Sequence, residues 1–212
     1  MYSKVFDSSL VVGRFQHPHI GHEHLINTAL AVSGRVLILL GSAQEVGTVR
    51  NPFSTSTRTE MIRAMYPDRE TVLIGEIPDL DNGDEKLVTA DWARHVMSMT
   101  KIHLRKIPEV MVYGGESQNT NWFSVDENIS FMTRGMSELI VSRTRHVISA
   151  TKMRNYLLKD EFADWSKFAS QHLHKHYDRL RGELMNSPGY AEIIRKSRAP
   201  REGWTDKPNL LV

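Results

Sequence analysis

The chain has 212 residues, of which 40% are apolar and 25% are charged, with a formal net charge of +2 and no cysteine. This length suits one well-filled α/β domain with an elaborated end. So small a charge gives no indication of a nucleic-acid or membrane surface, and the lack of cysteine excludes disulfides, thiolate metal sites and cysteine nucleophiles. No stretch approaches the ~18 apolar residues of a membrane span, so we expect a cytoplasmic protein that binds neither nucleic acid nor a membrane.

Short apolar runs alternate with longer amphipathic runs along most of the chain. Runs of strand length, rich in branched aliphatic residues, cover 8–12, 35–40, 71–74, 109–113 and 129–132. Helical spacing covers 23–32, 56–65 and 86–104. Strands that alternate with helices form parallel sheets joined by right-handed crossovers. The pattern therefore predicts an α/β fold, a Rossmann-like open parallel sheet flanked by helices.

The chain changes character towards its C-terminus. Residues 162–184 have a helical pattern, whereas prolines and little periodicity follow from about Ser187. We expect the sheet domain to occupy residues 1–160 and a C-terminal helical extension and tail to occupy residues 161–212. The tail shows no residues that indicate chemistry of its own.

The first apolar run leads through a turn rich in glycine and proline into a helical pattern. His19 and His22 are three residues apart at this junction, so their imidazoles lie on one side of the first helical turn. The free N–H groups and the positive dipole end of the helix are found at the same place and attract anions. Isolated histidines there are usually caps or surface residues, but the strand and turn before them favour a phosphate site. His17 and His24 lack such support, and we expect them to be structural or exposed to solvent.

Two further turns can hold an anion. After the second apolar run, small residues from Gly41 let a ligand approach the backbone, and Arg50 offers a forked donor. Late in the chain, Ser149 or Thr151 can cap a helix, and Arg154 follows one turn later. Because ligands of open parallel sheets bind beyond the carboxyl ends of the strands, we expect all three turns to meet at that edge.

These motifs resemble those of the nucleotidyltransferase superfamily of adenylyl- and cytidylyltransferases. His-Ile-Gly-His at 19–22, after Gly-Arg-Phe at 13–15, and the segment 148–154 match its signature pair. Gly-Arg-Phe-Gln, Gly-Ser-Ala-Gln-Glu and Arg-Asn-Pro-Phe, in this order, are similar to the archaeal-type nicotinamide-nucleotide adenylyltransferases. The similarity covers roughly residues 8–160. It departs from that family at Ala150, where many members have glycine, and in a longer stretch before Trp92.

The resemblance implies that the adenylyl group of ATP is transferred to nicotinamide mononucleotide, which gives NAD and pyrophosphate. The attacking 5′-phosphate is already an anion, so the reaction needs no general base and can depend on positioning and charge stabilisation. Magnesium would be carried by ATP, since no carboxylate cluster suggests a protein cage and no metal ligand is expected. His172, His174 and His176 lie two residues apart and point to different sides of a helix, which favours a polar surface over a shared metal. The family also implies a homo-oligomer.

The resemblance assigns residues to each part of the reaction. The expected catalytic residues are Arg14, His19, His22 and Arg154. The expected ATP-binding residues are Gly13, Arg14, Phe15, His19, Gly21, His22, Ser149, Thr151 and Arg154. The expected residues at the mononucleotide are Gly41, Ser42, Arg50, Asp79 and Trp92. Trp92 would stack on the nicotinamide ring, although its helical spacing with Val96 and Met99 equally suits core packing. For Arg58 and Glu60, a role in the site and a place on a solvated helix face are about equally favoured.

Other functions remain open at this point. The same chemistry can act on nicotinate mononucleotide, pantetheine phosphate or flavin mononucleotide. The His-Ile-Gly-His spelling also occurs in class I aminoacyl-tRNA synthetases, but their Lys-Met-Ser-Lys-Ser loop is missing and the chain is short for an anticodon domain. A non-catalytic module that senses nucleotides is the alternative of a different class, with 187–212 as its partner-binding segment.

Overall fold

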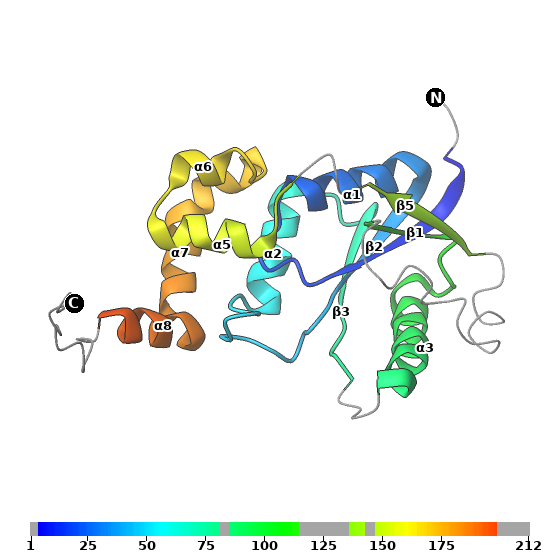
Figure 1. Cartoon of the computed structure of the whole chain (residues 1–212). Helices are drawn as coiled ribbons and strands as arrows, with labels where there is room; N and C mark the ends of the chain where they lie inside the picture. Colours follow the sequence, from blue (N-terminus) through cyan, green and yellow to red (C-terminus); the bar gives the residue numbers. More distant parts are fainter. Residues whose placement is uncertain (1–3, 81–84, 115–135, 143–146, 199–212) are drawn as a thin grey trace, which may run out of the picture.

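A parallel sheet lies at the centre of the molecule, whose computed structural model describes residues 4–80, 85–114, 136–142 and 147–198 (Figure 1). The sheet has five strands in the order β3-β2-β1-β4-β5, and every neighbouring pair is parallel. The strands are β1 (Phe6–Gly13), β2 (Ser33–Leu40), β3 (Val72–Glu76), β4 (Val110–Gly114) and β5 (Ser137–Val141). The predicted α/β fold with an open parallel sheet is confirmed.

Helices cover both faces of this sheet. They are α1 (Ile20–Val32), α2 (Thr55–Met65) and α3 (Glu85–Leu104). Along β2, Leu37 and Leu39 pack with α3, whereas Val36, Ile38 and Leu40 pack with α1 and α2. All five side chains are fully buried. Burial on both faces explains why this strand is a continuous apolar run in the sequence.

One edge of the sheet is formed by a strand that the sequence analysis did not predict. The predicted strand at 129–132 lies outside the described residues. Among the described residues, β5 forms this edge, and its apolar pattern is weak because side chains such as Ile140, which is 53% exposed, face water. None of the described helices is long and apolar enough to cross a membrane.

The C-terminal part of the chain is helical beyond residue 184, where the predicted helical pattern ends. It contains α5 (Ala150–Lys159), α6 (Phe162–Ser166), the 3₁₀ helix η1 (Gln171–His176), α7 (Tyr177–Asn186) and α8 (Pro188–Arg198). Residues 188–198 form a helix although their sequence shows little periodicity. Pro188 is the first residue of α8, a position that suits proline because the missing N–H would have no helical partner there.

A third core cluster joins these helices to the sheet domain. Phe53 and Met61 share this cluster with Met153, Trp165 and residues of α7 and α8. Buried residues therefore pack together from both sides of position 160. The division into a domain of 1–160 and an extension of 161–212 stays a prediction.

Candidate active site

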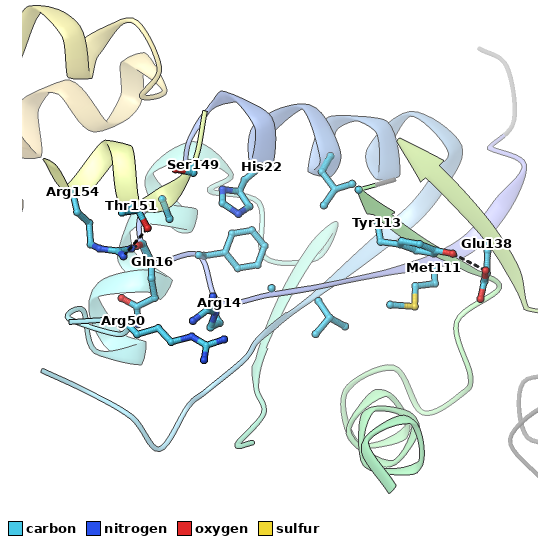
Figure 2. A pocket seen from close by; sticks show the side chains of 16 residues that line it. Arg14, Gln16, His22, Arg50, Met111, Tyr113, Glu138, Ser149, Thr151 and Arg154 are labelled. Carbon is cyan, nitrogen blue, oxygen red and sulfur yellow. Dashed lines mark hydrogen bonds between the residues drawn. The ribbon is translucent and has the colours of Figure 1, made fainter. Parts of the chain in front are cut away.

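A cavity of about 540 Å³ opens at the carboxyl ends of β1 and β4, between α1 and α5 (Figure 2). Its lining includes Gly13, Arg14, Phe15, Gln16, His22, Arg50, Met111, Tyr113, Glu138, Ser149, Thr151 and Arg154. A second cavity of about 300 Å³ adjoins it, shares Arg14, His22 and Ser149, and adds His19, Gly21 and His24 to the walls. The three predicted turns thus meet at one edge of the sheet, where open parallel sheets bind ligands.

The two histidines stand at the start of α1. His19 is the N-cap residue, and its backbone N–H donates to Nδ1 of His22 at 3.3 Å. The two ring centroids lie 3.9 Å apart, and the ring of Phe15 lies 4.8 Å from His22 on another side. A neutral imidazole that accepts a hydrogen bond at Nδ1 carries its proton on Nε2. His22 is therefore set up as an Nε2–H donor in the wall of the cavity.

The turn after β1 is held in an uncommon conformation. Phe15 has a φ of +52°, in the left-handed region that bulky residues rarely adopt. The buried side chain of Gln16 donates from Nε2 to the carbonyl oxygen of Phe53 at 2.8 Å and accepts from the Phe53 N–H at 3.0 Å. These two bonds fix the turn against the segment that follows Arg50. Gln16 was part of a motif, but its long-range partner could not be seen in the sequence.

Three arginines of the cavity wall repel one another. The pKa of Arg14 is lowered, first by burial and then by the positive charges of Arg50 and Arg154. Nη1 of Arg14 is buried and has no hydrogen-bond partner in the described part of the chain. An anion with several charges between these guanidinium groups would relieve the repulsion and accept their N–H groups.

Arg154 is buried and held on several sides. Its Nε donates to the hydroxyl of Tyr190 at 2.9 Å, its Nη2 donates to Thr151 Oγ1 at 3.2 Å, and its Nη1 donates to the carbonyl oxygen of Gln16. Its guanidinium group is therefore fixed in one orientation. Ser149 caps the same helix, since its Oγ accepts from the backbone N–H of Lys152 at 3.2 Å. Ser149, Ala150 and Thr151 line the larger cavity, so the N-terminus of α5 opens onto it.

Arg58 was not recognised as a buried residue from the sequence. It is fully buried, and its Nη1 donates to the carbonyl oxygens of Arg14 at 2.8 Å and Gly41 at 2.7 Å. It thereby connects the turns that follow β1 and β2. A signal was present, since Arg58 lies on the same helical stripe as Met61 and Ile62. Glu60 is on the exposed face instead and pairs with Arg179 at 3.2 Å.

Four predicted residues lie outside the walls of the two cavities. Gly41 and Ser42 are buried, and both offer carbonyl oxygens to Arg58. Asp79 is exposed, and its backbone N–H donates to the side chain of Gln44 at 3.0 Å. Trp92 is half-buried and packs against the core cluster on the α3 face of the sheet. Contact between these four residues and a ligand stays a prediction.

The far end of the larger cavity contains residues that no motif indicated. The hydroxyl of Tyr113, at the end of β4, donates to Oε2 of Glu138 on β5 at 2.7 Å (Figure 2). Burial and then the Glu138 carboxylate raise the pKa of Tyr113 to about 12. Met111 contributes an apolar surface beside them. Met111 and Tyr113 lie on a predicted strand, but Glu138 lies on β5, which the sequence analysis did not predict, so this end of the cavity was missed.

The family comparison agrees with this fold. The model of the cytidylyltransferase-like family matches residues 10–156, which include both helix N-termini of the site. The bifunctional NMN adenylyltransferase/ADP ribose pyrophosphatase of Francisella tularensis, in its complex with AMP and manganese, aligns with a TM-score of 0.60 and 21% identity. The alignment covers 92% of this chain and 57% of that one, and it shows a shared fold. The match to the family model, together with the fold, places the chain in the class of nucleotidyltransferases.

Sequence relatives narrow this class. The nicotinamide-nucleotide adenylyltransferase of Thermococcus onnurineus is 31% identical over 158 residues, which cover 72% of this chain and 73% of the relative. That of Aeropyrum pernix is 40% identical over 75 residues, which cover 34% and 44%. The chain spans about half the length of several curated relatives that it matches. It belongs to the cytidylyltransferase-like family and, within it, to the nicotinamide-nucleotide adenylyltransferases of archaeal type.

Proposed function

We propose that this protein transfers the adenylyl group of ATP to nicotinamide mononucleotide and forms NAD and pyrophosphate. The observation that carries the proposal is the meeting of Arg14, Arg50 and Arg154 at the N-termini of α1 and α5, in the wall of one cavity. Such a site attracts two phosphorylated substrates at once. Its relatives bear the name of this activity.

In this reaction, an oxygen of the mononucleotide phosphate attacks the α-phosphorus of ATP. The bond from that phosphorus to the bridging oxygen breaks, and pyrophosphate leaves with the electron pair. His22 would donate to an α-phosphate oxygen, where negative charge grows in the transition state, and His19 would assist beside it. Gly13, Phe15 and Gly21 would give the phosphates access to the backbone of this turn.

The other ATP phosphates are assigned to the second helix. Arg154 would bind the β- and γ-phosphates, and Ser149 and Thr151 would shape the N-terminus of α5 around them. Arg14 and Arg50 would neutralise the incoming phosphates, Arg14 at ATP and Arg50 at the mononucleotide. Without these cations, two anions would have to approach each other unshielded, so their role is to bring the reactants together in line.

The ring end of the mononucleotide is assigned to the remaining residues. Trp92 would stack on nicotinamide, Asp79 would accept from its amide, and Gly41 and Ser42 would lie close to the bound ligand. A Trp92→Ala variant tests the stacking: it should raise KM for the mononucleotide and leave KM for ATP unchanged. An equal rise in both, with a large loss of melting temperature, would assign Trp92 to the core alone.

The residues of the site suit a magnesium ion that arrives with ATP. Across the described segments, no group of three or more histidine, aspartate or glutamate side chains is placed to hold a metal. Glu138, a carboxylate in the lining of the larger cavity, already accepts from Tyr113. Phosphate oxygens and water would therefore supply the ligands. Bound there, the ion would neutralise charge on the phosphates. We also propose that the protein is a cytoplasmic homo-oligomer, as its family implies.

The decisive experiment mixes the purified protein with ATP, magnesium and a panel of acceptor phosphates and measures the mass of the product. The panel contains nicotinamide and nicotinate mononucleotides, pantetheine phosphate and flavin mononucleotide. We expect NAD from nicotinamide mononucleotide at the highest rate. A higher rate with another acceptor would change the assigned substrate. Binding of ATP without any product would show a nucleotide-sensing module instead.

A further inference from the structure

The C-terminal helix α8 reaches the phosphate site through one side chain. Tyr190 lies in the first turns of α8 and is only 4% exposed. Its hydroxyl accepts a hydrogen bond from Nε of Arg154 at 2.9 Å. Tyr190 lines neither of the two cavities described above, so it can influence a ligand only through Arg154.

The hydrogen bond to Tyr190 completes a set of three around one guanidinium group. The other two partners are the carbonyl oxygen of Gln16, in the turn after β1, and Oγ1 of Thr151, one turn earlier on α5. An arginine side chain has many rotamers, and a forked contact with phosphate requires one plane and one direction. Tyr190 restrains the Nε edge, which neither of the other two partners contacts.

We infer that Tyr190 is a positioning residue that orients Arg154 for the phosphates of ATP. The inference rests on the proposed function, because it takes Arg154 as a phosphate ligand. It also gives the C-terminal extension a role in the site. Without the tyrosine hydroxyl, Arg154 keeps its charge but loses a restraint on its plane.

The simpler explanation of Tyr190 is core packing. Its ring belongs to the third core cluster, which also contains Tyr177. Tyr177 is 6% exposed, and its hydroxyl donates to Oδ1 of Asp160 at 3.1 Å, away from the site. The two tyrosines therefore have similar burial and share a core cluster, and each hydroxyl has a charged partner, a guanidinium group for Tyr190 and a carboxylate for Tyr177. A Tyr→Phe change removes the same atom at each position, but only Tyr190 is connected to Arg154.

The experiment compares Tyr190→Phe with Tyr177→Phe. Calorimetry measures the Kd for ATP, steady-state kinetics gives KM for each substrate and kcat, and a thermal melt controls for folding. We expect Tyr190→Phe to raise Kd and KM for ATP roughly tenfold, the effect of losing one hydrogen bond to a charged group, with KM for the mononucleotide little changed. Tyr177→Phe should lower the melting temperature to a similar extent and leave the affinity for ATP unchanged.

A double-mutant cycle then separates positioning from packing. In an Arg154→Ala background, Tyr190→Phe should cause no further loss of ATP affinity, because the group that it orients is gone. Additive losses in the cycle would overturn the inference, and so would equal ATP affinities for the two phenylalanine variants. Failure of the unmodified protein to bind ATP would instead overturn the proposed function.

Discussion

Arg14 lies in the wall of the cavity, among the positive charges of Arg50 and Arg154. Burial and two neighbouring arginines lower its pKa, and its carbonyl oxygen accepts from the buried Arg58. A guanidinium group remains charged despite such a shift, since its ordinary pKa lies far above neutral pH. The protein therefore keeps an excess of positive charge in this wall. This arrangement favours ligands that carry several negative charges, as two nucleotides do.

At the residue scale, we predict that His22→Ala lowers kcat about 10²–10³-fold, the scale for loss of one preorganised donor in the transition state. The Nε2–H of His22 is fixed by the hydrogen bond that Nδ1 accepts from His19. Binding of the mononucleotide should change much less. Steady-state kinetics on a variant with an unchanged circular dichroism spectrum measures this effect. The exposed His172 supplies the control, since His172→Ala should keep normal turnover. Near-normal turnover of His22→Ala would remove this residue from catalysis.

The burial of His17 should make the folding stability depend on pH. It is fully buried, and this burial lowers its pKa to about 4 from an ordinary value of 6.5. Between these two values the unfolded chain binds a proton at His17 that the folded protein excludes. Folding stability is therefore complete above about pH 6.5 and declines as the pH falls towards 4, by about 3 kcal/mol in total.

Urea denaturation at several pH values measures this decline. A His17→Gln variant is the control, because it keeps a side chain that can donate to the carbonyl oxygen of Pro18 but has no proton to gain. The difference in unfolding free energy between the two proteins should shrink or reverse as the pH falls from 6.5 to 4. A constant difference across that range would show that His17 is protonated equally in both states.

At the scale of elements, α8 also contacts the loop that leads to Arg50. The N–H of Gly189 donates to the carbonyl oxygen of Gly47 at 2.8 Å, and a Cβ at position 189 would lie 2.6 Å from the backbone nitrogen of Val49. Such an approach is possible only for glycine. The start of α8 thus braces the loop of Arg50, while Tyr190 contacts Arg154.

This packing predicts the effect of Gly189→Ala. The added methyl group must displace the loop or the helix, so stability should fall by roughly 1–3 kcal/mol, as for other overpacked sites. KM for the mononucleotide should rise because Arg50 follows the displaced loop. Gly182→Ala in α7 is the matched control, since no heavy atom lies within 4 Å of its added Cβ. Thermal melts and kinetics of both variants test the prediction, which fails if the two behave alike.

The central elements could be predicted from the sequence because their environments leave a clear pattern. Strands such as β2 are buried on both faces, and the helix starts at His19 and Ser149 carry recognisable polar residues. In contrast, the roles of Arg58 and Tyr190 depend on partners 17 and 36 residues away in the chain. No local pattern encodes such contacts. They become visible only when the fold brings the elements together.

At the scale of the whole molecule, the site lies between two packed groups of elements. On one side is the sheet with α1, and on the other are the C-terminal helices, gathered beside α2 in Figure 1. Gln16, in the turn after β1, connects the two groups. Its side chain donates to the carbonyl oxygen of Phe53, and its own carbonyl oxygen accepts from Arg154 on α5. The geometry of the phosphate site therefore depends on how firmly the C-terminal helices are packed.

Trp165 provides a test of this dependence. It is fully buried at the centre of the third core cluster, in contact with Tyr177, whose ring centroid lies 5.0 Å away, and with His17 at 5.5 Å. Replacing a buried tryptophan with alanine costs roughly 3–5 kcal/mol of folding stability. Because this cluster supports α5 and Phe53, we expect Trp165→Ala also to weaken ATP binding, although Trp165 lines neither of the two cavities.

The control for this variant is Phe162→Ala, which removes an aromatic ring that is 44% exposed and lies 6.0 Å from Trp165. It should lose less stability than Trp165→Ala and keep its affinity for ATP, because nearly half of its surface is already in contact with water. Calorimetric titration with ATP, well below both melting temperatures, separates local rearrangement from unfolding. If Trp165→Ala remains folded at that temperature and binds ATP as tightly as Phe162→Ala, the C-terminal helices do not support the site. A selective loss of ATP affinity in the Trp165 variant would instead show that the position of Arg154 depends, through α5, on the packing of this cluster.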